Sequence, residues 1–439
     1  MKQNTPGRRT TRRSFLSTVA RTTAATAILG ASAGCAHQRM ASRVSRNRKR
    51  IALVATEVRK HSHAQHFIDR FLEGYGWQGR WHHPAMDLVA LYVDQFPEGD
   101  LSRDREKRFK ARIYPTIAEA LTLGGSKLAV DGVVIIGEHG KYPRNEKGQT
   151  LYPRYKFFKQ VVDVFEASGC AVPVFQDKHL STRWDECLAE VEASRRLGFP
   201  FLAGSSLPVT WRIPSTELPL RAPLVESVST CYGGVDSYDF HGLETAQCMS
   251  ERRAGGETGV RSVHASRGEN VWKLLAERPE TERLLFAALA RSHTLRSPSG
   301  DYTFSVPTID VLRRLSPDAV AYFIEHNDGF RTTMFLLNGA VSDFCYAGRT
   351  RRGEVISCQM HLPMPNHIST TADFFNPLAN HIEHMILEGR APYRVERTLL
   401  TSGVLLFAVE SLYRGQVRVE TPELRVTYEA PARSNFWRA

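Results

Sequence analysis

Short runs of β-branched and aromatic residues alternate with longer amphipathic segments in the middle of the chain. The runs predict strands over 133–136, 172–175 and 199–203, and the segments between them predict helices over 151–168 and 182–197. Parallel strands are buried on both faces and read as continuous apolar runs, and each needs a long crossover to the next. The pattern therefore predicts βαβ units in a parallel sheet.

The same alternation extends toward the N-terminus. It predicts further strands over 50–56, 87–93 and 112–114, with helices over 63–72 and 116–123. We therefore expect a Rossmann-like, doubly wound domain over residues 50–210. In such domains ligands bind beyond the carboxyl ends of the strands.

After Trp211 prolines punctuate a linker, and apolar and polar residues then alternate. The pattern predicts strands over 261–265, 319–325, 332–337, 355–360 and 418–428, and helices over 376–388 and 397–413. We expect an α+β domain with an open, mostly antiparallel sheet over 211–429, followed by a tail over 430–439. Because no second apolar cover for these strands is evident, we also expect a homo-oligomer.

The first residues carry an export pattern. Thr11-Arg12-Arg13-Ser14-Phe15-Leu16 is a twin-arginine motif, and a weakly apolar stretch follows it over 22–33. That stretch is too short and too polar to span a bilayer permanently. We expect a signal peptide over 1–36, a basic tail over 37–49, and a periplasmic or membrane-anchored protein. Lipidation of Cys35 and ordinary cleavage after Ala31-Ser32-Ala33 are both open.

Positive charge is concentrated in the same region. The chain has 58 Lys and Arg against 46 Asp and Glu, a net charge of +12, and residues 1–50 hold twelve basic and no acidic residues. The remaining chain is balanced, which argues against a nucleic-acid partner. The seven cysteines form no CxxC pair, so neither a zinc knuckle nor a dense disulfide framework is indicated.

Two predicted strands of the parallel sheet end in polar residues, Gly137-Glu138-His139 and Asp177-Lys178-His179. A lysine in a desolvated cleft has a lowered pKa and can act as a base on a sugar hydroxyl or beside a ketone. The ordinary alternative is a surface Lys178 that pairs with Asp177. His241 is a second candidate, as a donor to the same substrate oxygen, unless it is a satisfied core histidine.

The order of elements resembles the Gfo/Idh/MocA oxidoreductases over roughly residues 50–428. Asp177-Lys178-His179 stands where that family has Glu-Lys-Pro, and Phe240-His241-Gly242-Leu243-Glu244 is similar to the segment with its catalytic histidine. The family's aspartate four residues before that histidine is Ser237 here. The resemblance implies hydride transfer between NAD or NADP and a carbohydrate or polyol, with Lys178, His241 and Asp177 as catalytic residues.

The chain departs from this family at the cofactor turn. The family's G-x-G-x-x-G/A lets the backbone approach a pyrophosphate, but Ala55-Thr56-Glu57-Val58-Arg59-Lys60 occupies this place. Glu57 would repel a phosphate, whereas Arg59 and Lys60 would attract one. We therefore expect weak or altered dinucleotide binding. The candidate cofactor contacts are Thr56, Arg59, Asp94, Glu138 and Lys178.

The missing glycines leave two other functions open, a non-redox lyase or epimerase and a saccharide-binding protein on the same scaffold. We expect no metal; the alternative is a site in which His63 and His66, on one helical face, join His139 or Glu138. The long connection over 141–153 is a candidate lid over the cleft.

Overall fold

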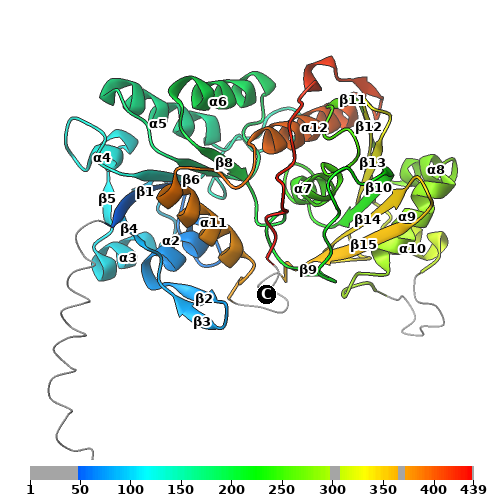
Figure 1. Cartoon of the computed structure of the whole chain (residues 1–439), viewed down its shortest axis with the longest axis horizontal. Coiled ribbons are helices and arrows are strands. Elements are labelled where there is room, and N and C mark those ends of the chain that lie inside the picture. Colours follow the sequence, from blue (N-terminus) through cyan, green and yellow to red (C-terminus); the bar gives the residue numbers. More distant parts are fainter. Residues whose placement is uncertain (1–47, 297–306, 364–370, 438–439) are drawn as a thin grey trace, which may run out of the picture. The chain divides into compact units, whose positions relative to one another are not determined.

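The computed structural model describes residues 48–296, 307–363 and 371–437. The predicted signal peptide, Cys35 and almost all of the basic tail lie outside the described residues. From Lys49 onward the chain is a single unit built on two large sheets (Figure 1). None of the described helices is long and apolar enough to cross a membrane, and the six described cysteines are free.

The first sheet has six parallel strands in the order β5-β4-β1-β6-β7-β8. Its elements are β1 (Lys49–Ala55), α2 (His63–Glu73), β4 (Met86–Val93), α3 (Ser102–Phe109), β5 (Arg112–Tyr114), α4 (Ile117–Thr122), β6 (Gly132–Ile136), α5 (Arg154–Ser168), β7 (Val174–Asp177), α6 (Trp184–Leu197) and β8 (Phe201–Gly204). Figure 1 shows α5 and α6 on one side of this sheet and α2 on the other. The predicted doubly wound fold is therefore confirmed.

The strand order reverses direction at β1, which pairs with β4 on one side and with β6 on the other. Loops after β1, β6, β7 and β8 therefore meet at the carboxyl edge of the sheet, where this fold class binds ligands. A small hairpin, β2 (Tyr75–Trp77) and β3 (Arg80–His82), follows α2 and was not predicted.

The second sheet has eight strands in the order β16-β11-β12-β13-β10-β14-β15-β9, and only β10 and β13 pair in parallel. Its strands are β9 (Arg212–Ile213), β10 (Leu224–Cys231), β11 (Val260–Arg267), β12 (Val320–His326), β13 (Arg331–Leu336), β14 (Phe344–Thr350), β15 (Val355–Met360) and β16 (Val419–Glu420). This confirms the open, mostly antiparallel sheet. The predicted last strand is wrong in length, because β16 has two residues and a 3₁₀ turn (Pro422–Leu424) follows it.

Helices cover both faces of the second sheet. They are α7 (Asp239–Ser250), α8 (Glu269–Ala276), α9 (Pro279–Leu289), α10 (Ile309–Leu315) and α12 (Glu396–Tyr413), whereas α11 (Phe375–Glu388) packs beside α2. Figure 1 shows α8, α9 and α10 on the side of the sheet away from α7.

Alternation along the strands divides the core between these two helix layers. Tyr322 and Met334 belong to the core shared with α7 and α12, whereas Phe323 and Phe335 belong to a second core with α8 and α9. The premise that the strands lack a second apolar cover is therefore wrong, since α8–α10 provide it. Self-association itself stays a prediction.

Candidate active site

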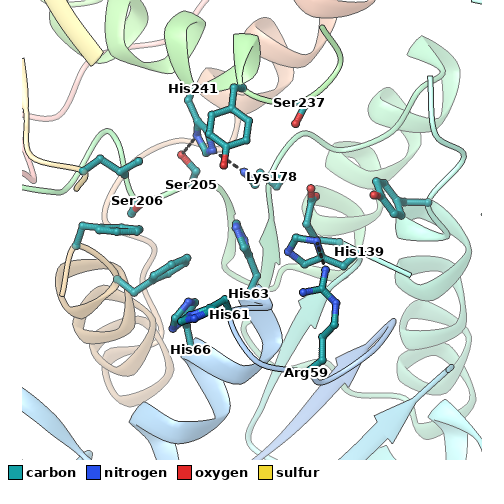
Figure 2. Close-up of a pocket in the computed structure, with 16 residues that line it drawn as sticks. Arg59, His61, His63, His66, His139, Lys178, Ser205, Ser206, Ser237 and His241 are labelled. Atoms are coloured by element: carbon teal, nitrogen blue, oxygen red, sulfur yellow. Dashed lines mark hydrogen bonds between the residues drawn. The ribbon is translucent and has the colours of Figure 1, made fainter. Parts of the chain in front are cut away.

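A cavity of about 310 Å³ lies at the carboxyl ends of β6, β7 and β8. Its wall carries five histidines together with Lys178, Arg59 and Glu138, and an apolar side made by Leu362, Phe374 and Phe375. Figure 2 shows His241, Lys178 and Ser205 converging at one end of this cavity, with His61 and His66 at the other end and His63 between them. The volume is that of a small-molecule site.

Lys178 follows β7 directly and points into the cavity. It is only 5% exposed, and its Nζ lies 2.5 Å from Nε2 of His241, which comes from α7. Lys178 adopts φ +71°, and so does His139 after β6. A non-glycine residue in the left-handed region is uncommon and concentrates at functional sites, where surrounding structure holds it in place. The surface pair between Lys178 and Asp177 is not formed.

His241 lines the cavity and accepts a hydrogen bond from Nζ of Lys178. Burial, followed by the charge of Lys178, lowers the pKa of His241 well below its usual value, so the ring is neutral. Because Nζ of Lys178 donates to Nε2, the single ring proton belongs on Nδ1, which lies 2.8 Å from Oγ of Ser205. His241 is thereby linked to Lys178, and its expected donation to substrate stays a prediction.

Glu138, which follows β6, also lines the cavity. Nη2 of Arg154 donates to its Oε2 at 2.7 Å, and Nη1 of Arg154 donates to Nε2 of His179 at 2.9 Å. Burial acts to raise the pKa of Glu138, but Arg154 and Lys178 outweigh it and hold that pKa far below the usual range. Glu138 is therefore a fixed carboxylate that accepts hydrogen bonds.

Asp177 lies outside the cavity wall, unlike its neighbour Lys178. It is fully buried, and its Oδ2 accepts a 2.6 Å hydrogen bond from Nδ1 of His63. Successive residues at a strand end point to opposite faces, so only one of the two faces the cavity. Asp177 thus orients His63, whose ring stands inside the cavity (Figure 2).

The predicted cofactor residues separate into two groups. Arg59, Glu138 and Lys178 line the cavity, whereas Thr56 is fully buried and donates to the carbonyl of Glu138. Asp94, exposed after β4, accepts hydrogen bonds from Tyr92 at 2.8 Å and from Tyr142 at 2.7 Å. Tyr142 belongs to the long connection over 141–153, so the candidate lid is attached at this strand end.

These contacts test the fit of a dinucleotide. The nicotinamide end fits, because the cavity lies beyond β6 and β7 and, among the described residues, the buried Nε2 of His139 has no hydrogen-bond partner. The adenosine end does not fit in the usual pose, because Tyr142 holds the strand-end carboxylate that would bind a ribose. In the turn itself Glu57 is buried and bonded to Nε of Arg59 at 2.6 Å.

Burial lowers the pKa of three cavity histidines, His66, His139 and His241. Burial, then the charge of Arg70, lowers the pKa of His66 to about 3, and burial, then His63, lowers the pKa of His139 to about 4. His66 stacks on Phe375 with the ring centres 4.9 Å apart. In the part of the chain that the structure describes, no three His, Cys, Asp or Glu side chains are grouped to hold a metal ion.

A buried neutral histidine makes stability depend on pH. The unfolded chain binds a proton on His66 below pH 6.5, whereas the folded chain binds it only near pH 3. The free energy of unfolding should therefore fall as the pH drops from 6.5, by roughly 2 kcal/mol from pH 7 to pH 5 for this residue.

The variant His66→Phe should lose that part of the pH dependence, measured by urea unfolding at both pH values. His83→Phe removes an exposed imidazole and is the matched control. An unchanged slope in His66→Phe would show that His66 is protonated equally in both states.

Sequence analysis missed several residues of this site. Ser205 follows β8 just as Lys178 follows β7, so the strand-end rule could have found it. Glu244 lies one helical turn from His241 and was noted only as part of a motif. Phe374 and Phe375 come from the start of α11, far along the chain, and no local signal connects them to the cavity.

Solved structures with the same fold were found at low sequence identity. Myo-inositol dehydrogenase from Lactobacillus casei, in complex with NAD(H) and myo-inositol, is 10% identical, and 85% of this chain aligns with 96% of it at a TM-score of 0.52. GenD2 from gentamicin A biosynthesis, in complex with NAD, is 13% identical over 85% and 96% of the two chains, at a TM-score of 0.51.

A third structure, apo scyllo-inositol dehydrogenase from Lactobacillus casei, is 10% identical over 85% and 98% of the two chains, at a TM-score of 0.50. Neither a protein-family model nor a curated protein matches the sequence. At these identities the likeness shows the fold. The two-domain fold implied by the Gfo/Idh/MocA resemblance is therefore confirmed.

Proposed function

We propose that this chain is an oxidoreductase that acts on a sugar or polyol, with Lys178 handling the proton of the reacting hydroxyl. The observation that carries the proposal is the buried pair of Lys178 and His241 in a cavity at the carboxyl edge of the parallel sheet. The fold shared with inositol dehydrogenases supports it. The cavity of about 310 Å³ has the volume of a small-molecule site and so suits a sugar or polyol.

The residues have separable roles in this proposal. Lys178, as the neutral amine, takes the hydroxyl proton, and the neutral ring of His241 accepts a hydrogen bond from the resulting ammonium. Glu138, fixed by Arg154, accepts from a neighbouring hydroxyl, and Phe375 offers an apolar face to the carbon skeleton. A nicotinamide, when bound, supplies the hydride acceptor; Glu138, Lys178 and Arg59 would hold its reactive end.

Two assays separate this function from its rivals. The purified protein is mixed with NAD or NADP and a panel of inositols, aldoses and uronic acids, and reduced nicotinamide is measured by absorbance. In parallel, each sugar is incubated in D₂O without nucleotide and examined by NMR. Nicotinamide reduction supports the proposal, whereas carbon–deuterium exchange without nucleotide contradicts it. Binding without conversion would identify a saccharide-binding protein.

A non-redox lyase or epimerase is the second candidate, and the contacts of Asp94 favour it. A carboxylate already held by Tyr92 and Tyr142 is not free for a ribose, and Glu57 places a negative charge in the turn where a pyrophosphate would bind. Lys178 could move a proton beside a ketone without any dinucleotide.

The cofactor turn gives a direct prediction. Glu57→Gly should strengthen NAD binding, because it removes a negative charge, frees Arg59 to meet a phosphate and lets the backbone approach it. Affinities from isothermal calorimetry test this, with Glu146→Gly in the long connection as a control that removes an acid elsewhere. Parental affinity as tight as that of ordinary dehydrogenases would show that the missing glycines matter little.

Export by the twin-arginine route is part of the proposal, on the strength of the sequence motif. Replacing Arg12 and Arg13 by lysine should retain the protein in the cytoplasm, because the transport machinery recognises the arginine pair. Cell fractionation measures the outcome. Undiminished export of the double variant would contradict the proposed route and with it the periplasmic location.

A further inference from the structure

We propose that Ser205 and Glu244 are positioning residues of a buried proton relay that connects Lys178 to the protein interior. The inference rests on the proposed function for its first step, the proton taken by Lys178. It adds a destination for that proton. The expected donor His241 is then a middle link rather than the end of the path.

The relay is continuous in hydrogen bonds. Lys178 Nζ meets Nε2 of His241 at 2.5 Å, and the opposite ring nitrogen, Nδ1, meets Oγ of Ser205 at 2.8 Å. The Ser205 hydroxyl then donates to Oε2 of Glu244, and the Ser205 backbone N–H donates to Oε1 at 2.9 Å. Each donor of the relay therefore has an acceptor, and both ring nitrogens of His241 take part in hydrogen bonds.

The backbone lets Glu244 on α7 come close to Ser205 at the end of β8. His241 and Glu244 lie three residues apart on α7 and so share one face, and Ser205 follows Gly204 at the end of β8. Gly204 adopts φ +115°, and a Cβ at this position would lie 2.5 Å from Oε1 of Glu244. Only glycine lets the helix carboxylate come this close to the strand end.

Few charges face Glu244, which is 1% exposed. Lys178 and His241 face it across Ser205, and Arg397 approaches from α12 but is paired with Glu251. Tyr393, whose hydroxyl is near Gly204, donates to the carbonyl of Ala203. Burial therefore outweighs the bonds from Ser205 and raises the pKa of Glu244 to about 7. The carboxylate can accept a proton at neutral pH.

The proton step is balanced. A substrate O–H bond breaks and an N–H bond forms on the Lys178 amine. Lys178 passes a proton to Nε2 of His241, while Nδ1 releases its proton to Ser205 and Ser205 releases its own to Glu244. The amine is restored, His241 holds its proton on Nε2, and Glu244 is a carboxylic acid. Only protons move between these side chains, so the same relay can serve the oxidation of a hydroxyl or the reduction of a carbonyl.

The test uses variants that keep shape. Glu244→Gln removes the acid, and Ser205→Ala cuts the link with the loss of one oxygen. Glu190→Gln is the matched control. Glu190, on α6, is a fully buried carboxyl that accepts a hydrogen bond from Gln176 on β7, away from the relay. Infrared spectra of the full mature protein across neutral pH report protonated carboxyl groups, and nitrogen NMR of labelled histidine reports the His241 tautomer. Neither readout requires a substrate.

We expect carboxylic-acid absorbance that titrates near pH 7, reduced in Glu244→Gln and unchanged in Glu190→Gln. Burial also raises the pKa of Asp236 to about 7, so Asp236→Asn serves as a spectral reference. His241 should carry its proton on Nδ1, and Ser205→Ala should disturb that signal. With a sugar that turns over, both relay variants should lose roughly 10²-fold in kcat and lose the pH step near 7.

An unchanged band in Glu244→Gln, or a His241 signal indifferent to Ser205→Ala, would overturn the relay. If the spectra behave as expected and no sugar is converted, the relay stands and the proposed function fails. If a sugar is converted and both variants keep the parental pH profile, the function stands and the relay fails.

Discussion

Replacing Lys178 by methionine is expected to lower turnover by about 10²–10⁴-fold, the usual cost of losing a positioned general base. The change keeps the side-chain stem and deletes the amine, which lies in the cavity 2.5 Å from His241. Binding of substrate should weaken less than kcat falls, because Glu138 and the apolar side of the cavity are untouched. Steady-state kinetics with the sugar identified in the panel measures both.

Lys156→Met is the matched control, since Lys156 is an exposed lysine on α5 outside the cavity. It should keep parental kinetics. Circular dichroism and the thermal midpoint should show that Lys178→Met still folds. Turnover within a factor of about three of the parent in folded Lys178→Met would remove Lys178 from the chemistry, because no general base acts so weakly.

The parallel half of the fold was predictable because burial on both faces leaves a simple signal. Residues Val133 to Ile136 are fully buried, so the strand must be apolar throughout, and the intervening helices carry one apolar face each. Helix ends were less sharp. The helix predicted from 151 begins at Arg154, because Pro153 fixes its start.

The second sheet was harder to predict, because which of its residues are buried depends on the helices packed against it. All residues of α7 are buried, so this helix has no amphipathic stripe to recognise. In β10 the buried Ser227 and Ser229 bond residues of α7, and Thr230 is buried as well, so the strand carries no apolar alternation. Strand β14, which is buried on both faces, was missed in the same way, whereas helices α8–α10 were missed although α8 and α9 each bury one face.

The candidate site was predictable where it depends on strand ends alone. Lys178 and Glu138 follow β7 and β6, and the fold directs both to the cavity. The face taken by each side chain was not predictable, and so Asp177 turned out to bind His63 outside the cavity wall. The partnership of Ser205 with Glu244 depends on how closely α7 approaches β8, a distance that no local pattern encodes.

The approach of α7 depends in turn on a buried ion pair with α12. Arg397 donates to Glu251 through Nε at 2.8 Å and Nη2 at 2.5 Å, and the two side chains are 4% and 1% exposed. Such a pair contributes little over apolar packing when it is intact, but removal of one partner leaves an uncompensated charge in the interior. Tyr428 also donates to Glu251, at 2.8 Å, and cannot neutralise that charge.

Arg397→Met is therefore expected to lower the free energy of unfolding by about 3–5 kcal/mol, measured from urea midpoints with an unchanged m-value. The double variant Arg397→Met/Glu251→Met should recover most of the loss, because it removes the charge as well as its partner. Arg418→Met, which breaks a half-exposed pair with Glu325, should cost about 0–1 kcal/mol. A double variant no more stable than Arg397→Met would mean that the loss of stability comes from the missing packing around the Arg397 stem and not from the unpaired charge of Glu251.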